Sequence, residues 1–435
     1  MQADSCTRCR GLMVPSFTDA LALEIAEAAQ SPSWRCVNCG EWLDETIMSN
    51  RLRRQHANIY LCNTRTAVYP PTMVAIRLRR RIKEIAIRIS AQVIRAPEKG
   101  TIMTEQPNMA GKNVWSIVLA GGEGERVKPF VLRWLGRHRP KQYCAFVGSR
   151  SMFEHTVDRA AHVSSLQQTV VVAARHHRHE LSKQLHGRPI RKLIRQPINR
   201  NTAAGIFLPL SYIRAHHPHA LVVIQPSDHF IYPERRFLET VRLSVASAEA
   251  MPNRLVLLGV QPDRLETEYG WIRPGARLHG SPSSPVHAVS SFLEKPELAQ
   301  ADTALRSGGL WNTLVLTATV KALWQAGWDC FPAMMPLFER LCSTWNTSGE
   351  AAVLEEIYRD MPKHNFSSHL LQQIPDHVAV MELTGVLWSD WGKPERISET
   401  IRRIGKTPTF PLDCLDRPFT PNPIPQRAEE ALATA

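Results

Sequence analysis

Long apolar runs are missing from this sequence of 435 residues. None approaches the roughly 20 consecutive apolar residues of a membrane-spanning helix, which excludes an integral helical membrane protein. The first ten residues, MQADSCTRCR, also lack the apolar core of a secretory signal, so we expect a cytoplasmic protein. With 43% hydrophobic and 21% charged residues, the composition excludes a disordered chain, a collagen-like repeat and a coiled coil. The length predicts a globular protein of about two to four domains.

Cysteine is scarce, and four of the nine cysteines form two C-x-x-C pairs. Cys6 pairs with Cys9, and Cys36 pairs with Cys39. In a cytosolic chain such pairs favour a metal over disulfides, and four thiolates suit a structural Zn2+ ion in tetrahedral coordination. We therefore interpret residues 1–48 as a zinc-ribbon-like module, with unrelated thiols as the alternative.

Positive charge is concentrated in one segment of the chain, whose formal net charge is +13. Residues 49–99 hold twelve Lys and Arg against two Asp and Glu, whereas residues 111–435 have a net charge of only +8. We interpret residues 49–110 as a basic linker without stable structure. An amphipathic helix that binds nucleic acid, an acidic membrane surface or a partner is the alternative. Nucleic acid is expected to bind, if at all, only through residues 1–110.

Apolar β-branched runs alternate with helical patterns in the rest of the chain. The runs read VWSIVLA, QTVVVAA, ALVVIQP and RLVLLGV. Buried strands that alternate with helices are typical of a mostly parallel sheet covered on both faces. The sequence thus predicts an α/β, Rossmann-like domain over residues 111–404 and a peripheral proline-rich tail over residues 405–435. We expect this domain not to need residues 1–102, and Met103 is a candidate for the native start.

A glycine-rich loop follows the first predicted strand directly. Its glycines are Gly121, Gly122 and Gly124. Glycines at this point let backbone N–H groups approach a phosphate chain, and Arg126 and Lys141 add fixed positive charge. The G-K-[ST] ending of a Walker A loop is missing. The loop therefore predicts a triphosphate site of another kind.

This loop is the first of seven motifs whose sequences and order resemble those of the sugar-1-phosphate nucleotidyltransferases, most closely the mannose-1-phosphate guanylyltransferases. They are LAGGEGERVKP (119–129) with RPKQ (139–142), RNTA (200–203), QPSDH (225–229), EYGWI (268–272), FLEKP (292–296), WN (311–312) and WSDWG (388–392). The resemblance implies an enzyme that transfers GMP from GTP to mannose 1-phosphate, giving GDP-mannose and pyrophosphate. The same reaction with another sugar 1-phosphate and UTP or dTTP is the alternative within the family.

The resemblance also implies the roles of individual residues. The catalytic residues would be Arg126, Lys141, Asp228 and Asp390, with the two aspartates holding Mg2+. The nucleotide would lie against Leu119, Ala120, Gly121, Gly122, Gly124, Arg126, Asn201 and Thr202. The sugar 1-phosphate would contact Tyr269, Gly270, Glu294, Lys295 and Asn312. Glu294 and Lys295 are expected on one strand, with their side chains on opposite faces.

Two features depart from the family pattern or add to it. Glu125 and Glu268 stand where the family has Thr and Gly, and such changes bear on which substrates are used rather than on the type of reaction. His176, His177 and His179 follow the strand QTVVVAA. We interpret these histidines as the polar, solvated start of a helix rather than as a metal site.

A function of a different class is a regulator, in which residues 1–110 bind nucleic acid and a degenerate transferase domain senses a nucleotide sugar. The presence of Arg126, Lys141, Asp228 and Asp390 argues against it, because a sensor need not keep metal- and phosphate-binding groups. The sequence leaves the oligomeric state open, a homo-oligomer included.

Overall fold

The computed structural model describes residues 113–416 and, nearer the N-terminus, the backbone of three short strands. These strands are β1 (Met13–Ser16), β2 (Ser33–Cys36) and β3 (Trp42–Leu43), which form an antiparallel sheet in that order. The contacts divide the chain into two units, Met1–Glu105 and Gln106–Ala435. Cys36 ends β2, whereas Cys6, Cys9, Cys39 and the basic segment lie outside the described residues. The zinc-ribbon interpretation therefore stays a prediction.

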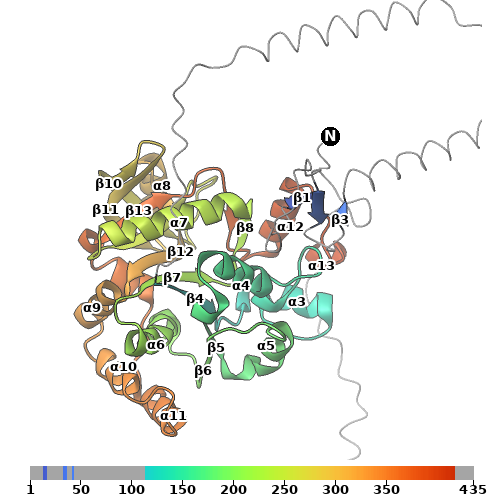
Figure 1. Cartoon of the computed structure of the whole chain (residues 1–435). Helices are drawn as coiled ribbons and strands as arrows, with labels where there is room; N and C mark the ends of the chain where they lie inside the picture. The colour runs from blue at the N-terminus through green and yellow to red at the C-terminus, as the bar shows by residue number, and fades with distance from the viewer. Residues whose placement is uncertain (1–12, 17–32, 37–41, 44–112, 417–435) are drawn as a thin grey trace, which may run out of the picture. The chain divides into compact units, whose positions relative to one another are not determined.

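A nine-stranded sheet forms the centre of the second unit (Figure 1), with the order β10-β11-β13-β9-β12-β7-β4-β5-β6. The strands are β4 (Val114–Ala120), β5 (Thr169–Ala174), β6 (Lys192–Gln196), β7 (Leu221–Pro226), β9 (Leu255–Val260), β10 (Gly270–Ser281), β11 (Ser284–Glu294), β12 (Leu310–Thr319) and β13 (Val378–Glu382). The strands β11 and β12 run against the other seven. The mostly parallel α/β sheet predicted from the sequence is confirmed, and the four apolar runs form β4, β5, β7 and β9.

Helices cover both faces of this sheet (Figure 1). One face packs against α6 (Asn201–His216), α9 (Val320–Cys330), α10 (Met335–Cys342) and α11 (Glu350–Asp360). The other face packs against α4 (Met152–Val163), α5 (Arg178–Gln184), α7 (Glu234–Ala250) and α8 (Leu298–Arg306). The neighbouring residues Ile117 and Val118 of β4 are both fully buried, each in the core of a different face. Burial on both faces is why this strand reads as a continuous apolar run.

A smaller helical layer joins distant parts of the chain. It contains α3 (Lys128–Leu135), α12 (Pro394–Arg403) and α13 (Asp413–Asp416). Phe410 is 3% exposed, and its ring packs edge-on against Phe130 of α3 with the ring centroids 5.0 Å apart. The prediction of a peripheral tail from residue 405 onwards is therefore wrong for its first residues, because Phe410 fills the core of this layer. Residues 417–435 lie outside the described residues.

Short elements form the connections around these strands and helices. The strand β8 (Phe230–Tyr232) pairs antiparallel with β14 (Leu387–Ser389), which brings the QPSDH and WSDWG segments together. The helical turns are η1 (Glu125–Val127), η2 (Lys141–Tyr143), η3 (Leu166–Gln168), η4 (Arg175–His177), η5 (Ser367–Leu371) and η6 (Pro375–His377). Within the described part of the chain, no helix is both long and apolar enough to cross a membrane.

Candidate active site

The glycine loop between β4 and η1 is held in shape by side chains of η2. The buried Gln142 side chain donates from Nε2 to the carbonyl oxygens of Ala120, at 3.0 Å, and Gly122, at 2.8 Å. The Tyr143 hydroxyl also donates to the Ala120 carbonyl, at 3.1 Å. Because these bonds fix one carbonyl at the end of β4 and one within the loop, they set the backbone conformation in which the loop N–H groups could face a phosphate chain.

Gly124 places this loop directly against Lys141. Its φ of +66° lies in the left-handed region, and a Cβ there would come within 3.0 Å of both the main-chain nitrogen and the Cβ of Lys141. A side chain at position 124 would therefore meet backbone that cannot move aside cheaply. Gly136, at the end of α3, has the same φ but open space around the position of a Cβ.

These two glycines give a matched test of the contact. Gly136→Ala should cost about 1 kcal/mol of the free energy of unfolding, because it meets only the left-handed backbone penalty. Gly124→Ala should cost more and should also lower turnover, since it displaces Lys141. Chemical denaturation and turnover assays of both variants measure the difference. Equal losses of stability, with turnover unchanged in both, would show that the contact with Lys141 is unimportant.

Lys141 connects the two predicted metal ligands. Its side chain is 5% exposed, and Nζ lies 2.9 Å from Asp228 Oδ2 and donates to the main-chain oxygen of Asp390. Asp228 follows β7 and Asp390 follows β14, so two distant segments meet at one ammonium group. Desolvation alone would raise the pKa of Asp228, but the charges of Lys141 and His229 outweigh it and lower this pKa to about 2. Asp228 is therefore a carboxylate at neutral pH.

The buried Asp390 carboxylate is surrounded by donors. Its Oδ1 accepts from the Tyr269 hydroxyl (2.5 Å), the Gly392 main-chain nitrogen (2.9 Å) and Arg396 Nη1 (3.1 Å), and its Oδ2 accepts from Arg126 Nη2 (2.8 Å). Burial would raise the pKa of Asp390, yet the charge of Lys141 and these hydrogen bonds lower it. A Cβ at Gly392 would collide with both Asp390 and Arg126, which explains the glycine in the WSDWG segment.

Arg126 joins the glycine loop to the EYGWI segment. Its Nη1 donates to Glu268 Oε2, while Lys393 Nζ lies 3.5 Å from Glu268 Oε1. Glu268 thus forms an ion pair with Arg126, the arginine that the family resemblance predicts to bind the triphosphate. The side chains of Arg126 and Glu268 are 49% and 37% exposed, so an anionic ligand could displace this carboxylate at small cost.

The residues predicted to contact the sugar come together where β10, β11 and β12 adjoin. A Cβ at Gly270 would lie 2.9 Å from Glu294 Oε2 and 3.3 Å from the Cβ of Asn312. Burial raises the pKa of Glu294. The Asn312 Oδ1 accepts from the main-chain nitrogen of Leu314 at 3.0 Å, which holds the amide at the register shift between β12 and β9. This corner therefore offers the carboxylate of Glu294 and the amide of Asn312 as hydrogen-bonding groups, and Gly270 leaves space beside them for a polar ligand.

Lys295 does not share a strand with Glu294, so the expectation of opposite faces on one strand is wrong. The strand β11 ends at Glu294, and Lys295 has a φ of +47°. The main-chain nitrogen of Lys295 donates to the main-chain oxygen of Tyr269 at 3.2 Å, one position beyond the last pair of β10 and β11. The left-handed backbone at Lys295 has no signal in the sequence, because lysine carries no preference for it.

The RNTA segment begins α6 beside the glycine loop. Asn201 and Thr202 are exposed, and Thr202 Oγ1 accepts from the main-chain nitrogen of Phe366 at 2.8 Å. Gln196 lies between the loop and this helix, since its Oε1 would be 2.8 Å from a Cβ at Gly121 and 3.8 Å from one at Gly205.

The strand β4 is also bonded to the QPSDH segment just before the loop. The carbonyl oxygen of Leu119 in β4 accepts from both the main-chain nitrogen and the hydroxyl group of Ser227.

Three residues of this site are not among those predicted from the sequence. Gln142 could have been predicted from the sequence, because it is the last residue of the RPKQ motif. No sequence pattern pointed to Arg396 or Glu266. Their side chains form a buried ion pair, and each side chain is 9% exposed. Arg396 Nη1 also donates to the Tyr269 hydroxyl at 2.7 Å, so this pair supports the tyrosine that bonds to Asp390.

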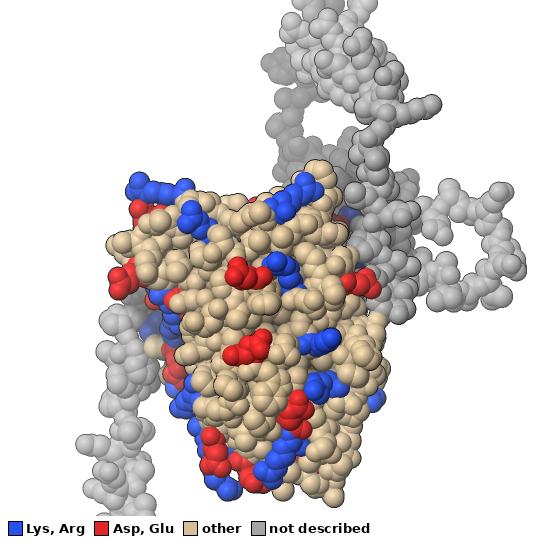
Figure 2. Space-filling view, turned by 90° about the vertical axis from the view of Figure 1, so that its left-hand side faces the viewer, with Lys and Arg blue, Asp and Glu red and all other residues tan. Residues whose placement is uncertain are grey.

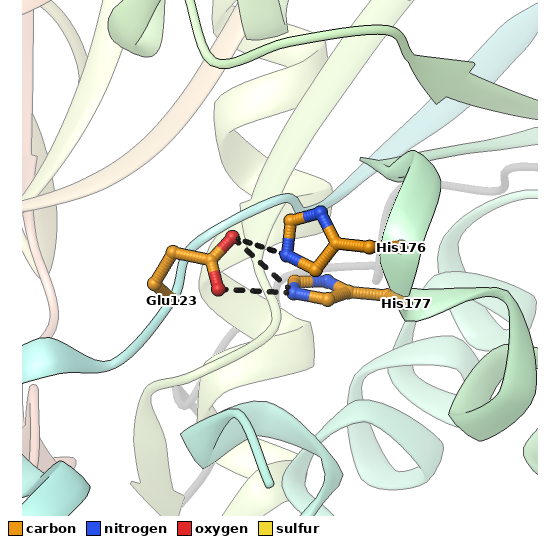
Figure 3. Close-up of side chains that lie close together, drawn as sticks. All are labelled: Glu123, His176 and His177. Atoms are coloured by element: carbon orange, nitrogen blue, oxygen red, sulfur yellow. Dashed lines mark hydrogen bonds and ion pairs between the residues drawn. The ribbon is translucent and has the colours of Figure 1, made fainter. Parts of the chain in front are cut away.

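Glu123 of the glycine loop meets two histidines of η4 (Figure 3). His176 Nε2 lies 2.9 Å and His177 Nε2 lies 3.4 Å from Glu123 Oε1. The side chain of His176 is 67% exposed, whereas that of His177 is only 2% exposed. The prediction of a solvated helix start is therefore wrong for His177, which is buried against Ala120 and Tyr143, although His179 is exposed.

Known proteins resemble the part of the chain that carries this site. The nucleotidyl transferase family model matches residues 115–407. The mannose-1-phosphate guanylyltransferase of Escherichia coli (strain K12) is 30% identical over 292 residues, covering 65% of this chain and 59% of the relative. The alginate biosynthesis protein AlgA of Pseudomonas aeruginosa is 32% identical over 201 residues, covering 45% of this chain and 40% of the relative.

A solved structure, described as a mannose-1-phosphate geranyltransferase from Thermus thermophilus, superimposes with a TM-score of 0.56 and 25% identity. The match covers 66% of this chain and 79% of that one. The chain spans only 59% and 40% of the length of the two curated relatives above. The family match nevertheless includes the glycine loop, Lys141, Asp228 and Asp390. This chain belongs to the nucleotidyl transferase family.

Proposed function

We propose that this chain is an enzyme that transfers a nucleotidyl group from a nucleoside triphosphate to a sugar 1-phosphate, with GTP and mannose 1-phosphate as the preferred substrates. The observation that carries the proposal is the meeting of Asp228 and Asp390 at the buried Lys141, directly beside the glycine loop. Relatives named mannose-1-phosphate guanylyltransferase support the choice of base and sugar.

In the proposed reaction, a phosphate oxygen of the sugar 1-phosphate attacks the α-phosphorus of the triphosphate in line, and pyrophosphate leaves. The glycine loop and Arg126 hold the triphosphate, and Lys141 neutralises charge on the reacting phosphoryl group. Glu294 and Asn312 orient the sugar through its hydroxyl groups. Because two polyanions must approach each other, positioning and charge neutralisation supply the catalysis, and no covalent intermediate with the protein is needed.

The donor set of Asp228 and Asp390 fits Mg2+, which prefers carboxylate and phosphate oxygens. Both carboxylates have lowered pKa values, so both are ionised at neutral pH. Asp228 is the more accessible of the two, with its side chain 38% exposed against 9% for Asp390. When bound there, Mg2+ would neutralise charge shared between the two substrates.

Pyrophosphate release tests this function across a grid of substrates. ATP, CTP, GTP, UTP and dTTP are each combined with mannose 1-phosphate, glucose 1-phosphate and other sugar 1-phosphates in the presence of Mg2+. We expect the highest kcat/KM with GTP and mannose 1-phosphate. A preference for UTP or dTTP with another sugar would select the alternative within the family, and the absence of release from every combination would contradict the proposed function.

The face of the transferase unit seen in Figure 2 adds no second nucleic-acid site to the one that the regulator hypothesis places in residues 1–110. On the face that lies at the left in Figure 1, Lys and Arg are interspersed with Asp and Glu, and no continuous basic patch is visible (Figure 2). A continuous basic patch is the usual footprint of a surface that contacts the phosphate backbone of nucleic acid. Salt-dependent binding of nucleic acid by the full chain, without transferase activity, would favour the regulator.

Glu294→Ala should raise the KM for the sugar 1-phosphate by about 10- to 100-fold and leave the KM for the triphosphate near its wild-type value. The reason is position, because Glu294 lies beside Gly270 and Asn312 rather than beside the glycine loop. Losing one hydrogen bond that a substrate hydroxyl donates to a charged carboxylate costs about 1.5–3 kcal/mol. Steady-state kinetics with each substrate varied measure the effect, with Glu239→Ala on α7 as the control at a half-exposed carboxylate. An unchanged KM for the sugar would remove Glu294 from the pocket.

Glu268→Gln should lower the KM for the triphosphate by a few fold, with little change in kcat. The substitution removes the charge that competes for Arg126 and keeps the shape of the side chain. The exposed pair of Glu399 with Arg264 offers a control, because Glu399→Gln removes an equivalent charge away from the loop. A higher KM for the triphosphate in Glu268→Gln would show that Glu268 assists binding instead of competing with it.

A further inference from the structure

Glu123, His176 and His177 form a cluster that the proposed reaction does not use. Glu123 lies between Gly122 and Gly124 in the glycine loop, and the histidines belong to η4 after β5. The three side chains point towards one another (Figure 3), and one potential ligand atom from each lies within 4.8 Å of the others. No other group of this kind occurs within the described part of the chain.

The spacing of these atoms is that of ligands around a small metal ion. Ligands at about 2.0–2.1 Å from a tetrahedral Zn2+ ion lie roughly 3.3–3.4 Å apart. The distances from Glu123 Oε1 are 2.9 Å to His176 Nε2 and 3.4 Å to His177 Nε2. A Zn2+ ion therefore needs only small movements of these side chains, and His176 is exposed enough to make them.

The surroundings of His177 favour the form of the ring that binds a metal. Its Nδ1 lies 3.3 Å from the carbonyl oxygen of Ala120, to which the neutral ring donates when Nδ1 carries the proton. In that tautomer Nε2 carries a lone pair, and this lone pair faces the Glu123 carboxylate. A cation between these two acceptors, either a proton or a metal ion, relieves their repulsion. A histidine that donates from one nitrogen to a carbonyl and binds metal through the other is the usual arrangement in metal sites.

We propose that Glu123, His176 and His177 bind a divalent transition-metal ion of the Zn2+ class, with a fourth position open to water or an anion. Two imidazoles and one carboxylate match the ligand set of open zinc sites, whereas Mg2+ prefers oxygen ligands alone. The site is thus chemically distinct from the Asp228 and Asp390 pair. A bound ion would tie the glycine loop to η4 and neutralise the charge of Glu123. The proposal does not depend on the transferase reaction.

Zn2+ binding to the metal-stripped full chain tests the site, measured by calorimetry and by metal content in excess Mg2+. His176→Ala and Glu123→Gln should each bind one equivalent of Zn2+ fewer than the wild type. His179→Ala, which removes an exposed histidine nearby, should bind as the wild type does. The four predicted cysteine ligands are the same in every variant, so their contribution cancels.

Equal Zn2+ binding by the wild type, His176→Ala and Glu123→Gln would overturn the proposal. Loss of the equivalent in His179→Ala as well, or its displacement by excess Mg2+, would also overturn it. His176 and Glu123 are chosen for substitution because His177 is buried and its loss could unfold the loop. Since the readout is metal bound, failure of this site and failure of the proposed transferase activity are distinguishable.

Discussion

Lys141→Met should lower turnover by about 10²–10³-fold, the loss typical of removing one preorganised charged donor from a reaction that develops negative charge. Lys141 is nearly fully buried and joins Asp228 to the backbone of Asp390 beside Gly124. Methionine keeps most of the apolar stem and removes the ammonium group. Arg126 is not free to replace that group, since it already bridges Asp390 and Glu268.

The control for this variant is Lys128→Met on α3. Lys128 is exposed and pairs with Glu125, so its charge lies close to the loop without contacting either aspartate. We expect near-wild-type turnover for Lys128→Met, and circular dichroism should show that both variants are folded. Turnover near that of the wild type in Lys141→Met would mean that the ammonium does not act on the reacting phosphate.

Asp228→Asn and Asp390→Asn should each reduce kcat by at least ~10²-fold, because each removes a charged oxygen ligand from the proposed Mg2+ site. Asp390→Asn should also lower the free energy of unfolding, since Arg126 and the buried Arg396 would lose their shared carboxylate. Asp228→Asn should affect stability less, because its side chain is partly exposed.

Kinetics at saturating Mg2+ and thermal unfolding of both variants check these expectations. Asp302→Asn is the matched control, because Asp302 forms an exposed pair with Arg306 on α8. Wild-type kcat in either Asp228→Asn or Asp390→Asn would show that the metal assignment is wrong for that residue. A large loss in Asp302→Asn would show that the assay reports damage to the fold instead.

The strands and the glycine loop could be predicted because their causes are local. A strand buried on both faces is apolar at nearly every position, and β4, β5, β7 and β9 are largely so. The motif order then indicated which loops carry site residues, and the structure brings Arg126, Lys141, Asp228 and Asp390 together. Predicting the strands, the glycine loop and the order of the motifs required no knowledge of contacts between distant segments.

The features that could not be predicted depend on such contacts. Arg396 looks like one more surface arginine of a basic chain until the fold buries it against Glu266, 130 residues away. Phe410 follows a proline-containing stretch, and its burial depends on α3 lying against it. His177 is buried because Ala120 and Glu123 come from another strand and loop, which the sequence around residue 177 does not show.

Transfer of the nucleotidyl group itself is the most direct test of the proposed function. GTP labelled with radioactive phosphorus at the α-phosphate is incubated with mannose 1-phosphate, Mg2+ and the full chain, and the products are separated. We predict that the label appears in a sugar nucleotide that migrates with GDP-mannose, in step with the release of unlabelled pyrophosphate. Label that remains in GTP, or that appears as GMP whether or not the sugar phosphate is present, would contradict the account.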